Sequence, residues 1–479
     1  MIIEDAPFLR PQEKAVPKNW DREADVVVIG TGFAGFAAAI EAHDAGSNVI
    51  ILEKNSCIGG NSIIATGAYN AVDPERQENQ GIEDSIDLHY RQTIEAGDFK
   101  GEPDKVRFLS EHALNGLKWL EDMGVQFEST VYTGIGALWP RTHDPVNKGR
   151  GAAIVRALKR QVAHRGIPIL MKSGLSAILR ERPLEGDVLG VRYMNNEKAM
   201  CIRARQAVVI CAGGFGADME MRSRYDPRLT ADIPTTNVRT ATGEVIRYAM
   251  DIGADIVGMD QIQLLVACNY YTKKYGSLVN LGIDSAIFIN KNGVRFVAED
   301  RRRDVLADAI LKQPDKMLLW IADEACNKRY KPHLIRKIIK NGYAFTASGP
   351  EALGETLRDK FNIPPETFLR TIRRYNESAK TGIDEDFGKA RQNLKPIGEP
   401  PLYASPVMAG VHYTMGGLKT GDITCRVLDR HGNTIPHLYA AGEVTGGMHG
   451  ANRVGGNATA ECIVFGREAG MRAAREYPR

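Results

Sequence analysis

Residues 24–35, ADVVVIGTGFAG, predict the first strand, turn and helix of a nucleotide-binding sheet. The run 24–30 is continuous and β-branched, as in a strand that is buried on both faces of a parallel sheet. Gly30, Gly32 and Gly35 have GxGxxG spacing and directly precede an Ala-rich segment. They would allow a tight turn, the approach of the backbone to a pyrophosphate and close packing of the helix, whose positive N-terminus faces the phosphate. This context, more than the glycines alone, indicates a dinucleotide site.

The chain around this motif predicts an α/β fold. A second β-branched strand ends at Glu53, 18 residues after Gly35, where an acid can hold ribose hydroxyls. Two further apolar strands are expected at 206–216 and 436–447, and the second of them precedes an Ala-rich helix. Between these strands the chain becomes richer in aromatic and basic residues, so we expect an inserted domain. The predicted parts are an N-terminal arm at 1–23, a nucleotide-binding domain at 24–260 and 405–479, and the inserted domain at 261–404.

The composition favours an enzyme. Among 479 residues, 62 are basic and 59 acidic, so no strong field favours nucleic acid or an anionic membrane. The seven cysteines lack CxxC, CxxCH and zinc spacings, so we expect free thiols, no metal and no haem in this chain. The first twenty residues lack the apolar core of a signal peptide, and no run approaches the ~20 apolar residues of a membrane span. We therefore predict a cytoplasmic protein.

The segment 55–71, NSCIGGNSIIATGAYNA, favours FAD over NAD. It resembles the stretch of FAD-dependent two-domain oxidoreductases that runs along the pyrophosphate toward the flavin. The whole of 24–475 resembles the fumarate reductase/succinate dehydrogenase flavoprotein family, most closely its soluble branch with flavocytochrome c fumarate reductase and urocanate reductase. The matching stretches are GGNS, VICAGGFG, INKNGVRFVAEDRRRD, GVHYTMGG at 410–417, and LYAAGEVTGGMHGANRVGGNA at 438–458.

The resemblance implies a discontinuous Rossmann-like FAD-binding domain and an inserted α+β capping domain that closes over the flavin. It also implies noncovalent FAD, because Asn61 stands where membrane-bound members have the histidine that attaches it. Gly455 and the two residues after it would bring a helix N-terminus to the pyrimidine edge of the flavin. The residues expected to bind FAD are Gly30, Gly32, Phe33, Ala34, Gly35, Glu53, Lys54, Gly60, Asn61, Ser62, Thr66, Gly67, Ala212, Gly213, Glu244, Tyr413, Gly442, Glu443, Arg453, Gly456, Asn457 and Ala458.

Three consecutive arginines, 301–303, raise the question of a catalytic cation. By pattern alone Asp304 is a plausible N-cap, and helical spacing does not choose among the arginines before it. A solvated basic patch is the simpler interpretation of the pattern. The family resemblance instead implies that Arg303 exchanges a proton with the substrate. It also implies that His412 and Arg453 clamp one substrate carboxylate and polarise the conjugated double bond.

Departures from the family pattern argue against fumarate as the substrate. The histidine that holds the second carboxylate aligns near 264–265, where this chain has two leucines, and the Glu and Arg of the proton relay align near Val279 and Gly282. The replacing region is apolar and then rich in tyrosine, with Tyr270, Tyr271 and Tyr275. We therefore expect a cyclic or otherwise apolar-bodied acid or ketone. Tyr270 or Tyr271 could replace Arg303 as the acid or base.

The predicted activity is FAD-dependent oxidation or reduction at a CH–CH or C=C bond next to a carboxylate or ketone. The direction is left open. An external electron donor or acceptor is expected, because no second GxGxxG unit for NAD(P)H occurs. One alternative is a ketone Δ-dehydrogenase, of the ketosteroid or oxocyclohexanecarboxylate type, with a tyrosine base. Another is an electron-carrying flavoprotein subunit of a larger complex.

Overall fold

A computed structural model describes residues 15–134, 136–146, 149–275, 286–327 and 332–477. The chain divides into two compact units. The first comprises Met1–Asp226, Asn237–Ile262 and Tyr413–Arg479, and the second comprises Pro227–Thr236 and Gln263–His412. The second unit therefore includes two segments outside the predicted range 261–404, namely 227–236 and 405–412.

A mixed sheet of eight strands forms the centre of the first unit. β1 (Arg22–Ile29) lies between β2 (Val49–Leu52) and β8 (Lys198–Ile210), and all three run parallel. The late strand β17 (Thr434–Ala440) adds in parallel to β8, with Leu438 opposite Val208. The sheet is extended by β16 (Arg426–Leu428), β5 (Ile169–Leu170), and the antiparallel pair β6 (Ser173–Arg182) and β7 (Glu185–Asn195). The predicted α/β fold, begun early and completed late in the chain, is confirmed.

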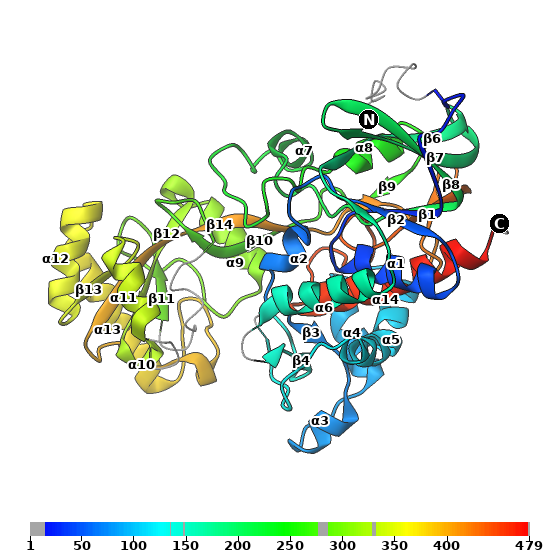
Figure 1. Cartoon of the computed structure of the whole chain (residues 1–479). Helices are drawn as coiled ribbons and strands as arrows, with labels where there is room; N and C mark the ends of the chain where they lie inside the picture. The colour runs from blue at the N-terminus through cyan, green and yellow to red at the C-terminus, as the bar shows by residue number, and fades with distance from the viewer. Residues whose placement is uncertain (1–14, 135, 147–148, 276–285, 328–331, 478–479) are drawn as a thin grey trace. The chain divides into compact units, whose positions relative to one another are not determined.

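Helix α1 (Phe33–Asp44) and the late helix α14 (Asn457–Arg475) pack against each other beside the sheet (Figure 1). Their backbones approach closely because α14 has glycine at two contact positions. A Cβ on Gly466 would lie 2.7 Å from the carbonyl oxygen of Ala34, and one on Gly470 would lie 2.1 Å from that of Ala38. Large side chains at these positions would therefore push the helices apart.

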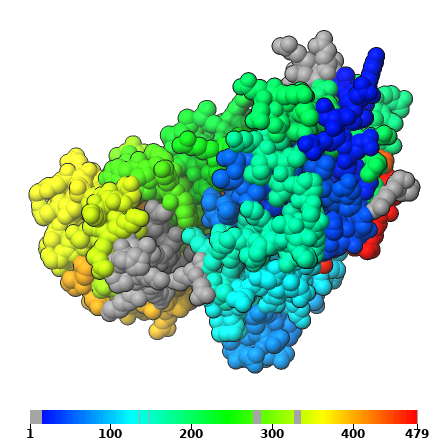
Figure 2. Space-filling view, viewed as in Figure 1, coloured from blue at the N-terminus to red at the C-terminus, as the bar shows by residue number. Residues whose placement is uncertain are grey.

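The first unit also contains shorter elements around this core. Helix α3 (Pro74–Glu78) has Asp73 as its N-cap, and Figures 1 and 2 show it projecting from the surface of this unit. The remaining helices of the unit are α2 (Gly60–Ile64), α3 (Pro74–Glu78), α4 (Ile86–Ala96), α5 (Pro103–Asp122), α6 (Arg150–His164), α7 (Met219–Tyr225) and α8 (Glu244–Met250). The remaining strands form two small sheets: β3 (Tyr69–Asn70) with β4 (Thr142–His143), and β9 (Ile256–Val257) with β15 (Gly417–Leu418).

The second unit is α+β. Its sheet has the order β10 (Ile262–Asn269), β14 (Leu402–Thr414), β12 (Met317–Ala322) and β11 (Ala286–Ile289), with β13 (Phe345–Ala347) also paired to β14. Trp320, Phe368 and Tyr375 are fully buried in this unit. Its helices are α9 (Arg303–Leu311), α10 (Glu324–Asn327), α11 (Pro332–Lys340), α12 (Pro350–Phe361) and α13 (Pro365–Thr381), with short 3-10 turns at Pro314–Lys316 and Arg391–Asn393. Across the described part of the chain, every helix is too short or too polar to traverse a bilayer.

Candidate active site

A pocket of about 850 Å³, counting the space at its mouth, opens in the first unit beyond the carboxyl ends of β1, β2 and β8. Ligands of open α/β sheets bind at this edge. The pocket collects residues from seven separate parts of the sequence. The predicted FAD-binding residues among its lining are Gly30, Gly32, Ala34, Glu53, Lys54, Gly60, Asn61, Ser62, Ala212, Gly213, Glu244, Gly442 and Glu443.

The glycine-rich turn between β1 and α1 is closely packed. Gly30 has φ +107°, and a Cβ there would lie 2.4 Å from the carbonyl oxygen of Cys211. A Cβ on Gly35 would lie 2.0 Å from the carbonyl oxygen of Gly30, so only glycine fits at the start of α1. Ser62 Oγ accepts a hydrogen bond from the backbone N–H of Phe33 at 3.1 Å, which ties α2 to the first turn of α1. The N-terminus of α1 is thereby held at the pocket, where it would attract a phosphate.

Two acidic residues occupy one end of the pocket. Glu53 is 5% exposed and accepts hydrogen bonds from the Thr31 hydroxyl and from the backbone N–H of Asn55, the latter at 2.8 Å. Lys54 pairs with Glu244. A carboxylate at the end of β2 is suited to binding ribose hydroxyls.

Asn61 and Glu443 line another part of the pocket. The Asn61 amide donates to Asn237 Oδ1 at 2.5 Å and accepts from the Val238 N–H at 2.9 Å, so it is fixed by the segment that follows residue 236. Glu443 Oε1 accepts hydrogen bonds from the backbone N–H and hydroxyl of Thr414 at 3.1 and 3.3 Å. Burial raises the pKa of Glu443 to about 7, against the opposing effect of these hydrogen bonds. Glu443 can therefore change its protonation near neutral pH.

The start of α14 is held by a buried polar network. Asn70 Nδ2 donates to the Gly455 carbonyl oxygen at 2.7 Å and to Asn457 Oδ1 at 2.8 Å. His89 Nε2 lies 3.2 Å from the same Asn457 oxygen, and burial lowers the pKa of His89 to about 4, so this ring is neutral at pH 7. Gly456, at φ +91°, leaves room for the Asn70 side chain. His89 was not predicted because it belongs to no recognisable motif, and Asn70 was not predicted although it lies in the quoted segment 55–71.

Arg453 belongs to a buried cluster of the first unit. Its guanidinium lies over the ring of Tyr413, 4.7 Å from the centroid. Tyr413 donates its hydroxyl hydrogen to Glu461 Oε2 at 2.8 Å, and His449 Nε2 lies 2.9 Å from the same oxygen. Burial disfavours the charge of Glu461, but His449 and Arg453 hold its pKa below the usual range. His449 and Glu461 were not predicted, although His449 lies in the matched stretch 438–458.

Other predicted FAD-binding residues lie outside the pocket lining. Phe33, Gly35 and Asn457 are buried at the starts of α1 and α14. A Cβ on Gly67 would lie 2.7 Å from the N–H nitrogen of Gly151, so this residue supports the start of α6. The remaining ones are Thr66, Tyr413, Arg453, Gly456 and Ala458.

The three consecutive arginines 301–303 have three different environments. Arg301 is exposed and donates to the Phe387 carbonyl oxygen at 3.2 Å. Arg302 is exposed and pairs with Asp304 at 2.6 Å. Arg303 is half-buried at the first position of α9, and its guanidinium donates to Gln263 Oε1 at 3.4 Å. Of these three arginines, only Arg303 is partly shielded from the solvent.

The sequence pattern suggested Asp304 as the N-cap of α9, but Asp304 does not occupy that position. The helix begins at Arg303, and Arg302 occupies the N-cap position, two residues before Asp304. Both carboxylate oxygens of Asp304 accept hydrogen bonds from the Arg302 guanidinium, at 3.0 and 2.6 Å. Asp304 still lies in the first turn, where a negative charge favours the helix dipole. Competition from the neighbouring arginine, which the N-cap pattern does not consider, explains the error.

His412 also belongs to the second unit. Its Nδ1 lies 2.8 Å from the Thr236 hydroxyl, and Thr236 comes from the segment 227–236. The neighbouring Val411 N–H donates to the Pro234 carbonyl oxygen at 2.8 Å. The segment thus fixes the imidazole of His412 from a distance of 176 residues along the chain.

The predicted tyrosines follow β10. Tyr270 is half-buried against the core of the second unit, with the Lys273 ammonium 4.5 Å from its ring centroid. Tyr271 is 49% exposed, and burial together with Tyr270 raises its pKa. Tyr275 is 42% exposed. Val279 and Gly282, which align with the family's proton relay, lie outside the described residues.

Comparison with known proteins identifies the fold family. The model of the FAD binding domain family matches residues 25–459. The chain belongs to this FAD-binding family. It is also a member of the fumarate reductase flavoprotein family, as the resemblance implied. The family match and the pocket together establish FAD as the cofactor.

Two curated relatives and one solved structure show the range of the family. The NADH:fumarate oxidoreductase of Klebsiella pneumoniae (strain 342) is 37% identical over 96% of this chain, which spans only about half (48%) of that protein. The urocanate reductase of Eggerthella lenta is 33% identical, over 97% of this chain and 77% of the relative. The open conformation of a flavocytochrome c3 fumarate reductase has a TM-score of 0.82 and 30% identity, covering 100% of this chain and 84% of that one. Such relatives establish an FAD-dependent oxidoreductase acting on CH–CH or C=C groups.

The residues of the first unit fit FAD. The glycine turn and the N-terminus of α1 suit the pyrophosphate, and Glu53 suits the ribose. The start of α14 offers a helix N-terminus whose partial positive charge would stabilise an anionic ring. The pyrophosphate and the ribose of FAD would therefore each meet a suitable group in the pocket lining.

Proposed function

We propose that this enzyme reduces a carbon–carbon double bond conjugated to a carboxylate, in a substrate with one anionic end and an apolar body. The observation that carries the proposal is the apolar replacement in β10. Leu264, which is 5% exposed, and Leu265 stand where the family pattern has the histidine for a second carboxylate. Leucine can contact an apolar group but cannot pair with an anion. A dicarboxylate such as fumarate would therefore leave one charge unpaired.

FAD supplies the hydride when it is bound. In the proposed reaction Arg303 delivers the proton to the carbon next to the carboxylate, while the hydride is added to the other carbon of the double bond. His412 and Arg453 bind the carboxylate, which draws electron density away from the double bond. The half-burial of Arg303, unlike the exposure of its two neighbours, supports its role. Arginine is a weak acid, so it must be reprotonated from another group after each turnover.

The names of the relatives favour reduction over desaturation, because both curated relatives described above are named for reducing an unsaturated acid or for the NADH:fumarate couple. We propose an external electron donor, since this sequence offers a single GxGxxG unit. The presence of His412, Arg453 and Arg303 together argues against a subunit that only carries electrons. Such a subunit would have no use for a carboxylate clamp.

A ketone dehydrogenase with a tyrosine base is less favoured. A tyrosine that removes a proton near neutral pH needs a lowered pKa, and the pKa of Tyr271 is raised. Tyr271 is also half exposed, so water would compete for its hydroxyl group. Tyr270 packs against the core of its unit, which is a structural role.

Flavin absorbance tests the proposal. The protein with its FAD reduced by dithionite, under anaerobic conditions, is mixed with fumarate, acrylate, urocanate, cinnamate, cyclohex-1-enecarboxylate or cyclohex-2-enone. We expect the monocarboxylates with an apolar or ring body to reoxidise the flavin fastest, and fumarate to do so very slowly. Rapid reoxidation by fumarate would overturn the substrate class. Reoxidation by the enone alone, or bleaching of the oxidised enzyme by saturated ketones, would favour the ketone dehydrogenase.

A further inference from the structure

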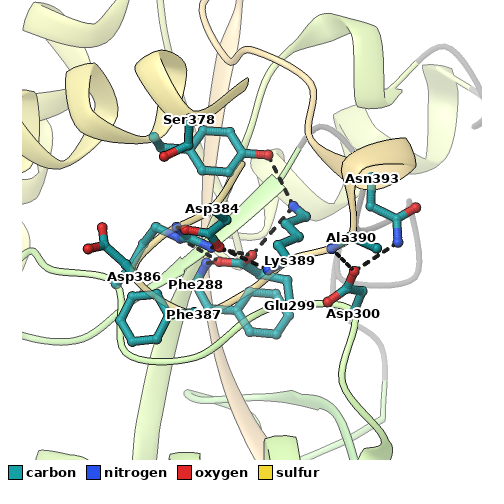
Figure 3. Close-up of polar contacts among 12 residues, drawn as sticks. Phe288, Glu299, Asp300, Ser378, Asp384, Asp386, Phe387, Lys389, Ala390 and Asn393 are labelled. Atoms are coloured by element: carbon teal, nitrogen blue, oxygen red, sulfur yellow. Dashed lines mark hydrogen bonds and ion pairs between the residues drawn. The ribbon is translucent and has the colours of Figure 1, made fainter. Parts of the chain in front are cut away.

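A cluster of four charged side chains is buried in the second unit, close in sequence to Arg303. Arg295, Glu299, Asp384 and Lys389 are between 1% and 8% exposed. The Arg295 guanidinium binds both carboxylates, with distances of 3.0 and 3.0 Å to the two oxygens of Glu299 and 3.1 and 2.9 Å to those of Asp384. Figure 3 shows Glu299 meeting Asp384 and Lys389, which come from a separate segment of the chain. The cluster thus links the segment 295–299 to the segment 384–389.

The cluster is electrically balanced and fully hydrogen-bonded around Lys389. The Lys389 ammonium lies 3.4 Å from Glu299 Oε2 and donates to the Ala286 carbonyl oxygen at 2.8 Å and to the Tyr375 hydroxyl at 3.1 Å. Its backbone N–H donates to Asp384 Oδ2 at 3.1 Å. A buried ion cluster of this kind is seldom more stabilising than apolar side chains of the same volume. The cluster instead fixes the direction of each of its charge-assisted hydrogen bonds.

The next residues along the chain extend the attachment toward Arg303. Asp300 Oδ2 accepts hydrogen bonds from the Ala390 N–H at 2.8 Å and from Asn393 Nδ2 at 3.0 Å, as Figure 3 shows. Arg301 donates to the Phe387 carbonyl oxygen. Three consecutive residues, 299–301, are therefore attached to one segment, 384–393. Helix α9 begins at Arg303, two residues after the last attachment.

The segment 384–393 is itself held by α13. Tyr375 and Arg374 of that helix contact Lys389 and Asp386, respectively. Gly382 ends the helix in a left-handed conformation at φ +76°, which sets the direction in which the chain leaves it. The segment is thus a rigid support rather than a free loop.

We propose that residues 384–393 form a platform that positions Arg303, and that Glu299 and Asp300 are the positioning residues that connect Arg303 to it. This inference rests on the proposed function, in which Arg303 transfers the proton. Arg303 is the first residue of α9, so a displacement of residues 299–301 would move the backbone from which its guanidinium extends. A proton donor displaced by ~1 Å can lose ~100-fold in rate.

Asp300 is the best residue for testing this, because it is only half-buried and carries no part of the buried ion cluster. Asp300→Ala removes Oδ2, which accepts both hydrogen bonds, whereas Asp300→Asn keeps one side-chain oxygen that can accept them. Asp308→Ala is the matched control, because it also removes one carboxylate. Asp308 lies on α9 and pairs with Arg228 at the surface, at 2.8 Å. All variants are compared as the full chain with FAD bound.

The first measurement is hydrogen exchange, which needs no substrate. We expect Asp300→Ala to speed exchange at least 10-fold in peptides covering 299–307 and 386–394, while Asp300→Asn and Asp308→Ala stay within about 2-fold of the wild type. Unchanged exchange in Asp300→Ala would overturn the platform.

The second measurement is reoxidation of dithionite-reduced enzyme by cinnamate, or by the fastest acid of the panel above. We expect Asp300→Ala to lower the limiting rate by roughly 10- to 100-fold, with at most a 2-fold change in half-saturating concentration, and Asp300→Asn to restore it. An Asp300→Asn enzyme as slow as Asp300→Ala would overturn the inference. If Arg303→Ala is inactive while Asp300→Ala is fully active, only the positioning role is wrong; if Arg303→Ala is fully active, the proposed role of Arg303 is wrong as well.

Discussion

Replacing Gly470 by alanine tests the close packing of α14 on α1. Alanine in a helix interior is ordinarily favoured over glycine by ~1 kcal/mol. Here the added Cβ would lie 2.1 Å from the carbonyl oxygen of Ala38 and 2.7 Å from its Cα. Non-bonded heavy atoms normally stay ~3.5 Å apart, and these two neighbours are backbone atoms that cannot rotate away. To restore this spacing the two helices would have to separate by ~1.4 Å.

Overpacking of this kind costs ~1–3 kcal/mol, so the clash should exceed the gain in helix propensity. We expect the Gly470→Ala protein to lose up to ~2 kcal/mol of unfolding free energy in urea, which is the overpacking cost minus the gain in helix propensity. Because α1 begins at the FAD pocket, the variant should also retain less FAD after gel filtration, measured as the flavin-to-protein absorbance ratio.

Gly354→Ala in α12 is the matched control. It is also in a helix, but the nearest atom to its new Cβ is Pro365 Cβ at 3.3 Å, and the next two are at 3.5 Å. Its stability should be unchanged or slightly higher. A Gly470→Ala protein that is as stable as the Gly354→Ala protein and keeps its full FAD would refute the reasoning.

Three further outcomes are expected. Acid precipitation should release all flavin into the supernatant, because Asn61 offers no nucleophile for a covalent bond; flavin on the precipitated chain would contradict this. Arg303→Ala should slow turnover ~100-fold or more while FAD stays bound, whereas Arg302→Ala, at an exposed neighbour, should change it less than 3-fold; equal rates would contradict the assignment. The raised pKa of Glu443, about 7 against an ordinary 4.5, stabilises the fold below pH 4.5, an effect lost as the pH rises through 7. This pKa shift corresponds to at most ~3 kcal/mol of unfolding free energy, and to less where solvent in the pocket reaches the carboxylate. Glu443→Gln should flatten this pH dependence of stability, measured by urea unfolding of the FAD-free protein.

The parts of the fold that the sequence predicted are those with local patterns. The β-branched run, the glycine turn and the Ala-rich helix follow one another within twenty residues, and each has its own propensity. Glu53 could be placed because its distance from Gly35 is set by one helix and one strand. The late strand was visible for the same reason, since Leu438 and its neighbours form an apolar run.

The parts that could not be predicted are long-range polar contacts. Thr236 meets His412 across 176 residues, and His89 meets Asn457 across 368. A single histidine or threonine has no periodicity that would mark its partner. Asp384 was likewise invisible as the partner of Arg295, because the pairing requires the chain to return after α12 and α13. Such contacts depend on the tertiary fold and leave no trace in short segments.

The joining of early and late elements in one sheet has a consequence for how the protein is made. The partners that close the first unit, β17 and α14, leave the ribosome more than 380 residues after β2. At ~5–20 residues per second this interval lasts ~20–80 s. Throughout it, the apolar face of α1 that contains Ala34 and Ala38 lacks the helix that covers it in the finished protein. The nascent chain must therefore keep this face from aggregating, by chaperone binding or by transient contacts of its own, and a chain that stops before α14 should never acquire its flavin.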